Sequence, residues 1–153
     1  MDITPSLRNN RHLVIFRVAP YVFCAPAAEV ESFIIPPPVS RLPKAPPSVL
    51  GVINHRGQVY RVIALRLKLG LESDPRTVGG QLILTRLAAG PTAFLVDDIT
   101  DVLPDTDLIR RPLHPRSPMD LFDAFVLKDA EILFHTSFER LERAGEIPYP
   151  NPD

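Results

Sequence analysis

Proline recurs along the whole chain and limits the secondary structure that the chain can form. It accounts for 18 of the 153 residues, more than twice the ~5% typical of proteins. Proline lacks a backbone N–H donor and interrupts helices. Six prolines lie between Pro36 and Pro47. The distribution therefore predicts many short strands joined by stiff connections, with few and short helices.

The stretch from Pro46 to Gly70 reads as an apolar strand, a tight turn, a second apolar strand and a leucine-rich segment. Arg56 and Gly57 mark the turn, because glycine adopts backbone angles that other residues avoid. Asn54, His55 and Arg56 therefore lie at the tip of a predicted hairpin. Such a tip is either solvated surface or a recognition element, since binding residues concentrate on loops held by rigid strands. The leucine-rich end has both strand and helical spacing, and we favour a helix that ends at Gly70.

The other apolar runs are short and bounded by turn residues, which predicts further strands. Single helical turns are expected at residues 27–29 and 46–50. Thr136 with Glu139 predicts a capping box for a short helix that ends at Arg143. The predicted strands cover residues 12–18, 21–25, 30–35, 82–87, 92–103, 121–127 and 130–135.

The order of the elements indicates two related units. Residues 51–69 and 123–141 both read as strand, tight turn, strand and amphipathic helix, although chance competes with a true repeat over so few residues. The segment at 72–80 carries the strongest turn signals and is the best candidate boundary. Residues 104–120 hold four prolines and three arginines and are expected to be a loop.

The overall composition excludes several classes of protein. The 17 basic and 18 acidic residues nearly cancel, so no nucleic-acid partner is expected. The lone Cys24 excludes an intrachain disulfide and suggests a reducing compartment. Residues 18–28 resemble part of a signal peptide, but Pro20 and Pro26 interrupt them and bulky Phe23 argues against a lipoprotein site. No run is long enough to span a membrane, and a cytoplasmic location is predicted.

No catalytic or metal-binding motif is apparent. The four histidines lack metal-ligand spacing, and there is no nucleophile elbow or phosphate loop. Asp97 and Asp98 are adjacent on a strand and would point to opposite faces. We therefore predict a protein that is not an enzyme and needs no metal or cofactor, with a small hydrolase that uses Cys24 or a histidine as the less favoured alternative. A module that reads proline-rich peptides is disfavoured because tryptophan is absent.

At the predicted hairpin the sequence resembles the CheW-like domain of bacterial chemosensory systems. The resemblance rests on the pattern P..P..V.GVIN.RG.V..VI.LR..LG over residues 43–70. Weaker matches are HLVIFRVAPYVF, which begins at His12, FLVDDITDVL, which begins at Phe94, and the closing ILFHTSFERL, which begins at Ile132. The resemblance extends over nearly the whole chain.

The resemblance implies a mainly β fold of two five-stranded, SH3-like β-barrels with a few short helices. A single domain is expected at residues 12–145. Its first subdomain would cover about 12–70 and its second about 80–135. Flexible tails would flank the domain at residues 1–11 and 146–153.

The resemblance also implies a non-catalytic scaffold that binds the signalling tip of a chemoreceptor and the regulatory domain of a CheA-type histidine kinase. The receptor would lie in an apolar groove between the barrels, with Arg56 at the edge of that groove. An alternative role for Arg56 is structural: it would link the two barrels to each other. The predicted partner-binding residues are Val30, Ser32, Val52, Asn54, His55, Arg56 and Gly57, and the predicted structural residues of the hairpin and helix are Gly51, Ile63, Ala64 and Leu65.

Several positions depart from the family pattern, among them Ala124 in place of a usual glycine and Ser137 in place of a usual aspartate. Ser32 stands where glutamate is common, Arg61 where proline is common, and His55 where an apolar residue is typical. Ala64 replaces an aspartate that would cap the following helix, a change of ~1 kcal/mol. These departures leave open a divergent adaptor that binds the receptor but not the kinase and serves a specialised pathway other than flagellar chemotaxis.

Overall fold

Short strands dominate the structure. The computed structural model describes residues 2–71, 79–112 and 121–145, so the predicted tail at 146–153 lies outside the described residues. The strands are β1 (His12–Val18), β2 (Tyr21–Pro26), β3 (Val30–Ile34), β4 (Val49–His55), β5 (Gln58–Ala64), β6 (Gln81–Leu87), β7 (Gly90–Val96), β8 (Asp98–Pro104), β9 (Ile109–Pro112), β10 (Ala124–Lys128) and β11 (Glu131–His135). The helices are the single turns η1 (Ala27–Glu29) and η2 (Asp105–Asp107), α1 (Leu65–Lys68) and α2 (Phe138–Arg143).

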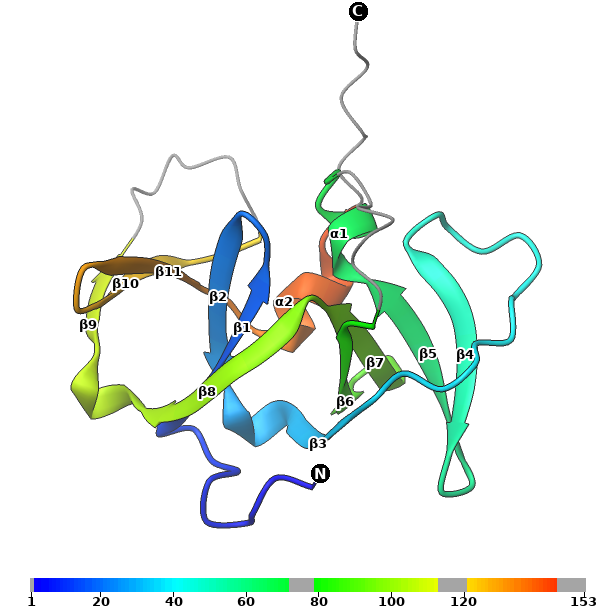
Figure 1. The fold of residues 1–153 in the computed structure, drawn as a ribbon, viewed down its shortest axis with the longest axis horizontal. Helices are drawn as coiled ribbons and strands as arrows, with labels where there is room; N and C mark the ends of the chain where they lie inside the picture. The colour runs from blue at the N-terminus through cyan, green and yellow to red at the C-terminus, as the bar shows by residue number, and fades with distance from the viewer. Residues whose placement is uncertain (1, 72–78, 113–120, 146–153) are drawn as a thin grey trace, which may run out of the picture.

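Two sheets lie side by side (Figure 1). One has six strands in the order β8-β1-β2-β11-β10-β9, and the other has five in the order β3-β6-β7-β5-β4. The predicted mainly β class with two sheets is confirmed. The six-stranded sheet exceeds the expected five because β9 forms within the segment predicted to be a loop and pairs with β10.

The sheets do not follow the predicted division of the chain into residues 12–70 and 80–135. Strands β1 and β2 belong with β8 to β11, whereas β3 to β7 form the other sheet. Two parallel pairings join strands that are far apart in the chain: β2 pairs with β11, and β5 pairs with β7. The chain thus crosses between sheets after β2 and returns after β7, which local hydrophobic patterns do not reveal.

The predicted internal resemblance between the two halves is present in the structure. Hairpin β4–β5 is followed by α1, and hairpin β10–β11 is followed by α2. Arg56 and Asp129 occupy the two turns with left-handed backbone angles, at φ 52° and 54°. Each unit contributes to a different sheet, so the two copies are spatially separate.

Residues on the two faces of β1 enter different cores. Leu13 and Ile15 pack inside the six-stranded sheet, whereas Val14 and Phe16 face the other sheet. This is the alternation expected of a strand that is buried on both faces. We call the core between the sheets the central cluster; among its members are Val14, Phe16, Val18, Phe23, Val30, Ile63, Ile83, Phe94, Phe138 and Leu141.

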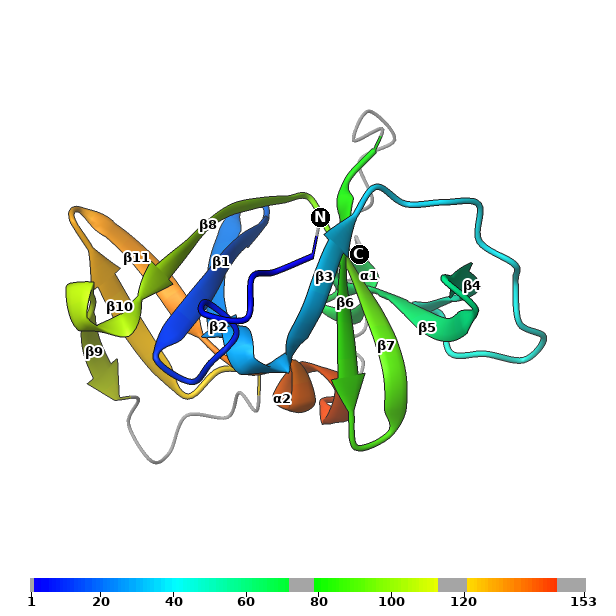
Figure 2. The same ribbon diagram turned by 90° about the horizontal axis from the view of Figure 1, so that it is seen from below.

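Helix α2 lies between the two sheets (Figure 2). Its first residue, Phe138, is fully buried, with ring centroids 5.6 Å from Phe16 of one sheet and 5.3 Å from Phe94 of the other. A single aromatic side chain therefore joins the two halves of the central cluster.

Two predicted local features are wrong. Residues 46–50 form turns followed by the start of β4, not a helix. The cap of α2 is Ser137, whose hydroxyl accepts a hydrogen bond from the Arg140 N–H, while Thr136 donates its hydroxyl to the Leu121 carbonyl. The side chain of Glu139 accepts a bond from the Ala88 N–H instead of closing a capping box. Tertiary contacts thus redirect both side chains.

Candidate functional site

The predicted hairpin tip is a rigid turn. Arg56 and Gly57 both have left-handed backbone angles, at φ 52° and 80°, which suits a two-residue hairpin turn. The Asn54 side-chain oxygen accepts a hydrogen bond from the Gly57 N–H at 3.0 Å. This bond explains why Asn54 and Gly57 occur together, and it holds the arginine between them in place. We call residues 54–57 the hairpin tip.

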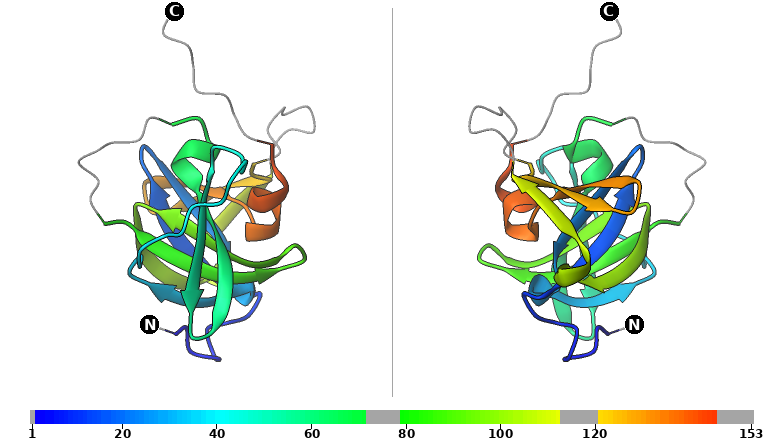
Figure 3. Two further views of the ribbon diagram at one scale, coloured as in Figure 1. Left: turned by 90° about the vertical axis from the view of Figure 1, so that its right-hand side faces the viewer. Right: turned by 90° about the vertical axis from the view of Figure 1, so that its left-hand side faces the viewer.

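The turn between β4 and β5, which holds Arg56, and the N-terminal segment lie at the same end of the molecule (Figures 1 and 3). The side chain of Arg56 is 72% exposed, and its guanidinium lies 3.0 Å from the carboxylate of Asp2. The alternative in which Arg56 ties the two sheets together is not what the structure shows, because this ion pair is solvent-exposed and involves the N-terminal segment. The guanidinium is accessible to a partner.

A hollow of about 530 Å³ lies beside the hairpin tip and has both polar and apolar lining. Strands β3, β4, β5 and β6 and the N-terminal segment all contribute to it. We call it the hairpin-tip hollow; it is lined by Asp2, Ile3, Pro5, Arg8, Glu31, Ser32, His55, Arg56, Gln58, Tyr60 and Arg86.

Glu31 connects strands β3, β5 and β6 at the hairpin-tip hollow through hydrogen bonds. Its carboxylate accepts hydrogen bonds from Arg86 at 2.7 Å and from the Tyr60 hydroxyl at 3.0 Å. Burial works to raise the pKa of Glu31, but the bonds from Arg86 and Tyr60 outweigh burial and lower it. Burial, then the bond to Glu31, raises the pKa of Tyr60. The Tyr60 ring also supports the His55 ring, at a centroid distance of 6.5 Å.

Three other predicted partner-binding residues lie on β3 and β4. Val30 is fully buried in the central cluster and presents no accessible surface to a partner, because the N-terminal end of β3 packs against the other sheet. Ser32 is only 4% exposed and reaches the floor of the hairpin-tip hollow. Val52 is half-buried and forms a bridge with Ser40. The hairpin tip therefore supplies most of the accessible surface in the predicted set.

The predicted structural residues lie below that surface. Ile63, Ala64 and Leu65 are at most 6% exposed. Gly51 has φ 148°, and a Cβ atom there would lie 2.0 Å from the Ser40 carbonyl oxygen, so any side chain would force the β3–β4 connection away from β4. Ala64 occupies the cap position of α1 without a side-chain bond. These positions lie within the hairpin and the start of α1, mostly below the surface.

An apolar hollow of about 150 Å³ is lined by residues at the end of α1, in the β1–β2 turn and on β11. Helix α1 and the turn between β4 and β5 lie at opposite ends of the molecule (Figure 1). None of the hairpin-tip residues contributes to this hollow. Its lining residues are Tyr21, Phe23, Leu69, Leu71, Leu121, Phe122 and Phe134.

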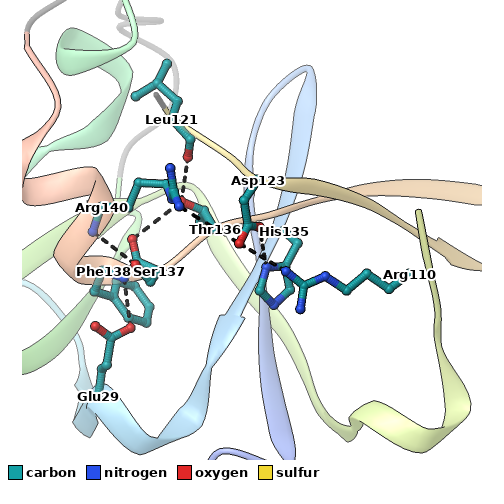
Figure 4. A network of polar contacts seen from close by, with 9 residues as sticks. All are labelled: Glu29, Arg110, Leu121, Asp123, His135, Thr136, Ser137, Phe138 and Arg140. Carbon is teal, nitrogen blue, oxygen red and sulfur yellow. Dashed lines mark hydrogen bonds and ion pairs between the residues drawn. The ribbon is translucent and has the colours of Figure 1, made fainter. Parts of the chain in front are cut away.

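A second polar cluster surrounds Asp123, where β10 and β11 approach α2 (Figure 4). One carboxylate oxygen of Asp123 lies 2.7 Å from Nδ1 of His135, and the other lies 3.1 Å from the guanidinium of Arg110. An aspartate–histidine pair resembles the base of a catalytic triad, which also requires an activated nucleophile. The neighbouring Thr136 hydroxyl is bonded to the Leu121 carbonyl. This cluster joins β9, β10, β11 and α2 and has no activated nucleophile among the described residues.

Cys24 also fails as a nucleophile. It is completely buried in the core of the six-stranded sheet. Burial, reinforced by the negative charge of Asp123, raises the pKa of its thiol from 9.0 to about 12, so the reactive thiolate is not formed near neutral pH. The described residues also contain no cluster of histidine, cysteine, aspartate and glutamate that could hold a metal ion.

The part of the site formed by the N-terminal segment is not predicted by the sequence. Asp2 and Ile3 were assigned to a flexible tail, yet Asp2 pairs with Arg56 and Ile3 is only 9% exposed. Glu31 and Arg86 were also missed. In the sequence, Asp2 and Ile3 are an acidic and a branched apolar residue within a polar segment. No local pattern shows that they lie beside the turn at Arg56, more than fifty residues later.

Comparisons with known proteins agree with this architecture. The model of the CheW-like domain family matches residues 12–141. The probable chemotaxis protein CheW of Rhizobium etli is 31% identical over 69% of this chain and 68% of its own length. The chemotaxis protein CheW of Rhizobium meliloti is 33% identical over 64% of this chain and 63% of its own length.

A solved structure supports the fold independently. The scaffolding protein TtCheW from Thermoanaerobacter tengcongensis superposes with a TM-score of 0.76, covering 90% of this chain and 97% of that protein at 17% identity. No described helix is both long and apolar enough to cross a membrane. The two relatives are named as chemotaxis proteins, and the family match agrees with the prediction of a protein that is not an enzyme. The chain belongs to the CheW-like domain family.

Proposed function

We propose that the protein is a non-catalytic scaffold that couples a chemoreceptor to a CheA-type histidine kinase in a bacterial chemosensory pathway. Its family and the names of its relatives support this role. The observation that carries the proposal is the hairpin tip, which presents an exposed Arg56 on a turn fixed by the Asn54–Gly57 bond. A scaffold of this kind works by holding two partners together, so it needs accessible docking groups and no reactive ones.

The chemistry of Arg56 suits a helical receptor tip. A guanidinium donates several hydrogen bonds in a fixed plane and can bridge carboxylates or backbone carbonyls at the end of a helix bundle. Because the turn is already ordered, little conformational entropy is lost when a partner binds. The tip would therefore act as an anchor, with the hairpin-tip hollow receiving adjacent side chains.

The departures from the family pattern affect this surface unequally. Ser32 and Ala64 are at most 6% exposed, so their substitution acts beneath the surface. Arg61 is different: its side chain is 36% exposed and pairs with Glu142 of α2 at 2.9 Å. Because Arg61 of β5 replaces a proline at an accessible position, it motivates a second candidate, an adaptor that binds the receptor and not the kinase and serves a specialised pathway.

Pull-down experiments separate the two candidates. The full chain is tested against a soluble chemoreceptor signalling-tip fragment and against a CheA-type regulatory domain. Capture of both supports the coupling scaffold, and capture of the receptor fragment alone supports the second candidate. Arg56→Glu should abolish receptor capture, whereas Arg111→Glu, an exposed charge reversal on β9, should leave it unchanged. Equal capture by wild type and Arg56→Glu would exclude the hairpin tip as the docking element.

The proposed location is the cytoplasm, with recruitment to receptor arrays. A fluorescent fusion of the full chain should form clusters in cells that contain the receptors. The Arg56→Glu fusion should be diffuse at the same expression level. Clusters that persist in the Arg56→Glu fusion would show that recruitment uses another surface.

A further inference from the structure

The N-terminal segment lies on the surface that we propose for docking. It runs from β1 across to β3 at the lower face of the molecule (Figure 2). Asp2 forms an antiparallel bridge with Ser32 on β3. Ile3 enters the central cluster, and Leu7 packs against the same cluster. Within the segment, the Thr4 carbonyl accepts bonds from the N–H groups of Leu7 and Arg8, at 2.9 and 3.1 Å, so the chain folds back as a compact turn.

Strand β3 is an edge of the five-stranded sheet. Edge strands leave backbone N–H and carbonyl groups without a strand neighbour and so accept added strands from other segments or other chains. The bridge between Asp2 and Ser32 uses this edge at one position only. The N-terminal segment thus covers one position of this edge, beside the hairpin tip, and lies on the surface that we propose for docking.

The contacts that hold this occupant can be exchanged for contacts with a partner. The ion pair between Asp2 and Arg56 is exposed on both sides, at 58% and 72%, and exposed ion pairs contribute little to stability. The other contacts are the packing of Ile3 and Leu7 on the central cluster and the single bridge to Ser32. An interface of standard size, which buries ~800 Å² on each partner, has ample area to replace these contacts.

The charges around the hairpin-tip hollow favour an acidic replacement for Asp2. Three arginines line the hollow, Arg8, Arg56 and Arg86, against the two carboxylates of Asp2 and Glu31. Arg86 is already bonded to Glu31 at 2.7 Å. When Asp2 leaves, Arg56 loses its carboxylate and the hollow becomes more positive. A partner segment must therefore bring a carboxylate of its own.

We propose that residues 2–8 are a displaceable occupant of the docking surface, and that the segment of the receptor that replaces them carries an acidic residue next to a branched aliphatic one. The inference rests on the proposed function, because the occupant and the receptor are taken to share Arg56. The carboxylate replaces Asp2 at Arg56, and the aliphatic side chain replaces Ile3 at the edge of the central cluster. Docking is consequently weaker than it would be on an open surface.

The affinity of the full chain for a soluble chemoreceptor signalling-tip fragment tests this inference. Asp2→Asn removes the internal carboxylate while leaving Ile3 and the fold in place, and it should bind the fragment about 5-fold more tightly. Glu131→Gln removes an exposed carboxylate from the β10–β11 hairpin and should bind like the wild type. Arg56→Ala should bind at least 10-fold more weakly, because it removes the group that both ligands use.

A structural readout accompanies the titration. The Ile3 methyl resonances should move from buried to solvent-exposed values as the fragment saturates the protein. Unchanged affinity in Asp2→Asn, or Ile3 resonances that do not move, together with weak binding by Arg56→Ala, would overturn the occupant and leave the proposed function standing. Wild-type affinity in Arg56→Ala would overturn the docking surface and this inference with it.

Discussion

A carboxylate oxygen of Glu29 accepts a hydrogen bond from the backbone N–H of Phe138 at 2.9 Å, although 109 residues separate the two in sequence. The second oxygen accepts a bond from the Glu139 N–H at 3.1 Å. Glu29 lies in η1, where the chain crosses from one sheet to the other, and Phe138 begins the helix between them. The first turn of α2 is therefore capped by a residue from the opposite end of the chain.

Removal of this distant cap should destabilise the protein. Glu29→Ala leaves two helix N–H groups without their acceptor, and loss of a helix cap costs about 1–2 kcal/mol. Urea unfolding of Glu29→Ala should show this decrease in the free energy of unfolding. Glu131→Ala, an exposed change on β11, should alter stability by less than about 0.5 kcal/mol. Equal losses in the two variants would contradict the capping role.

The same residue predicts a pH dependence. Burial raises the pKa of Glu29 above 4.5 in the folded protein, and the bonds from Phe138 and Glu139 only partly oppose the increase. The folded state therefore retains this proton to a higher pH than the unfolded state does, so stability decreases as pH rises from about 4.5 through the raised pKa. Glu29→Gln lacks this titration and should gain stability relative to wild type over that range. A constant difference between the two proteins across the range would contradict the prediction.

Phe138 should couple the two sheets during unfolding. Its ring contacts Phe16 and Phe94, which belong to different sheets. Phe138→Ala should lower the free energy of unfolding by about 3–5 kcal/mol while both sheets still unfold in one transition. Phe138→Leu preserves most of the volume and should lose less. Two separate transitions in the wild type, only one of which shifts in Phe138→Ala, would show that the sheets unfold independently.

Asp97 should contribute more than an ordinary surface acid. One of its oxygens lies 2.9 Å from Arg66 of α1 and accepts a bond from the Ala19 N–H at 2.8 Å. Its side chain is 12% exposed, and loss of bonds to such a charged group costs about 2 kcal/mol. Thermal unfolding of Asp97→Ala should reveal that loss. Arg17→Ala breaks an exposed pair with Asp98 and should have a much smaller effect; comparable losses would argue against the role of Asp97.

Cys24 should be unreactive in the folded protein. It is fully buried, and its thiol pKa is raised to about 12. A thiol-specific disulfide reagent at pH ~8, near the pKa of a free thiol, should label the native protein on the order of 100-fold more slowly than the urea-unfolded protein. Cys24→Ala should retain receptor binding. Rapid labelling of the native protein would revive the hydrolase alternative.

Local sequence patterns predicted much of the secondary structure. Strand β1, the turn at Arg56 and Gly57, and the hairpin between β10 and β11 all appear near their predicted positions. Each depends on neighbours in sequence: apolar residues favour a buried strand, and glycine favours a left-handed turn. Strand β9 was missed because its residues, Ile109–Pro112, carry charge and proline, and only pairing with β10 makes them a strand.

The mainly β class and the turn at Arg56 and Gly57 follow from the sequence, because proline content, hydrophobic spacing and a glycine turn are local properties; the family follows from the motif at residues 43–70. Tertiary structure alone decided which strands share a sheet, that Val30 is buried, that Glu29 caps α2, and that Asp2 faces Arg56. All four depend on contacts between residues far apart in the chain. Their free energy comes from burial and pairing in the folded molecule, and no local pattern of residues encodes such contacts.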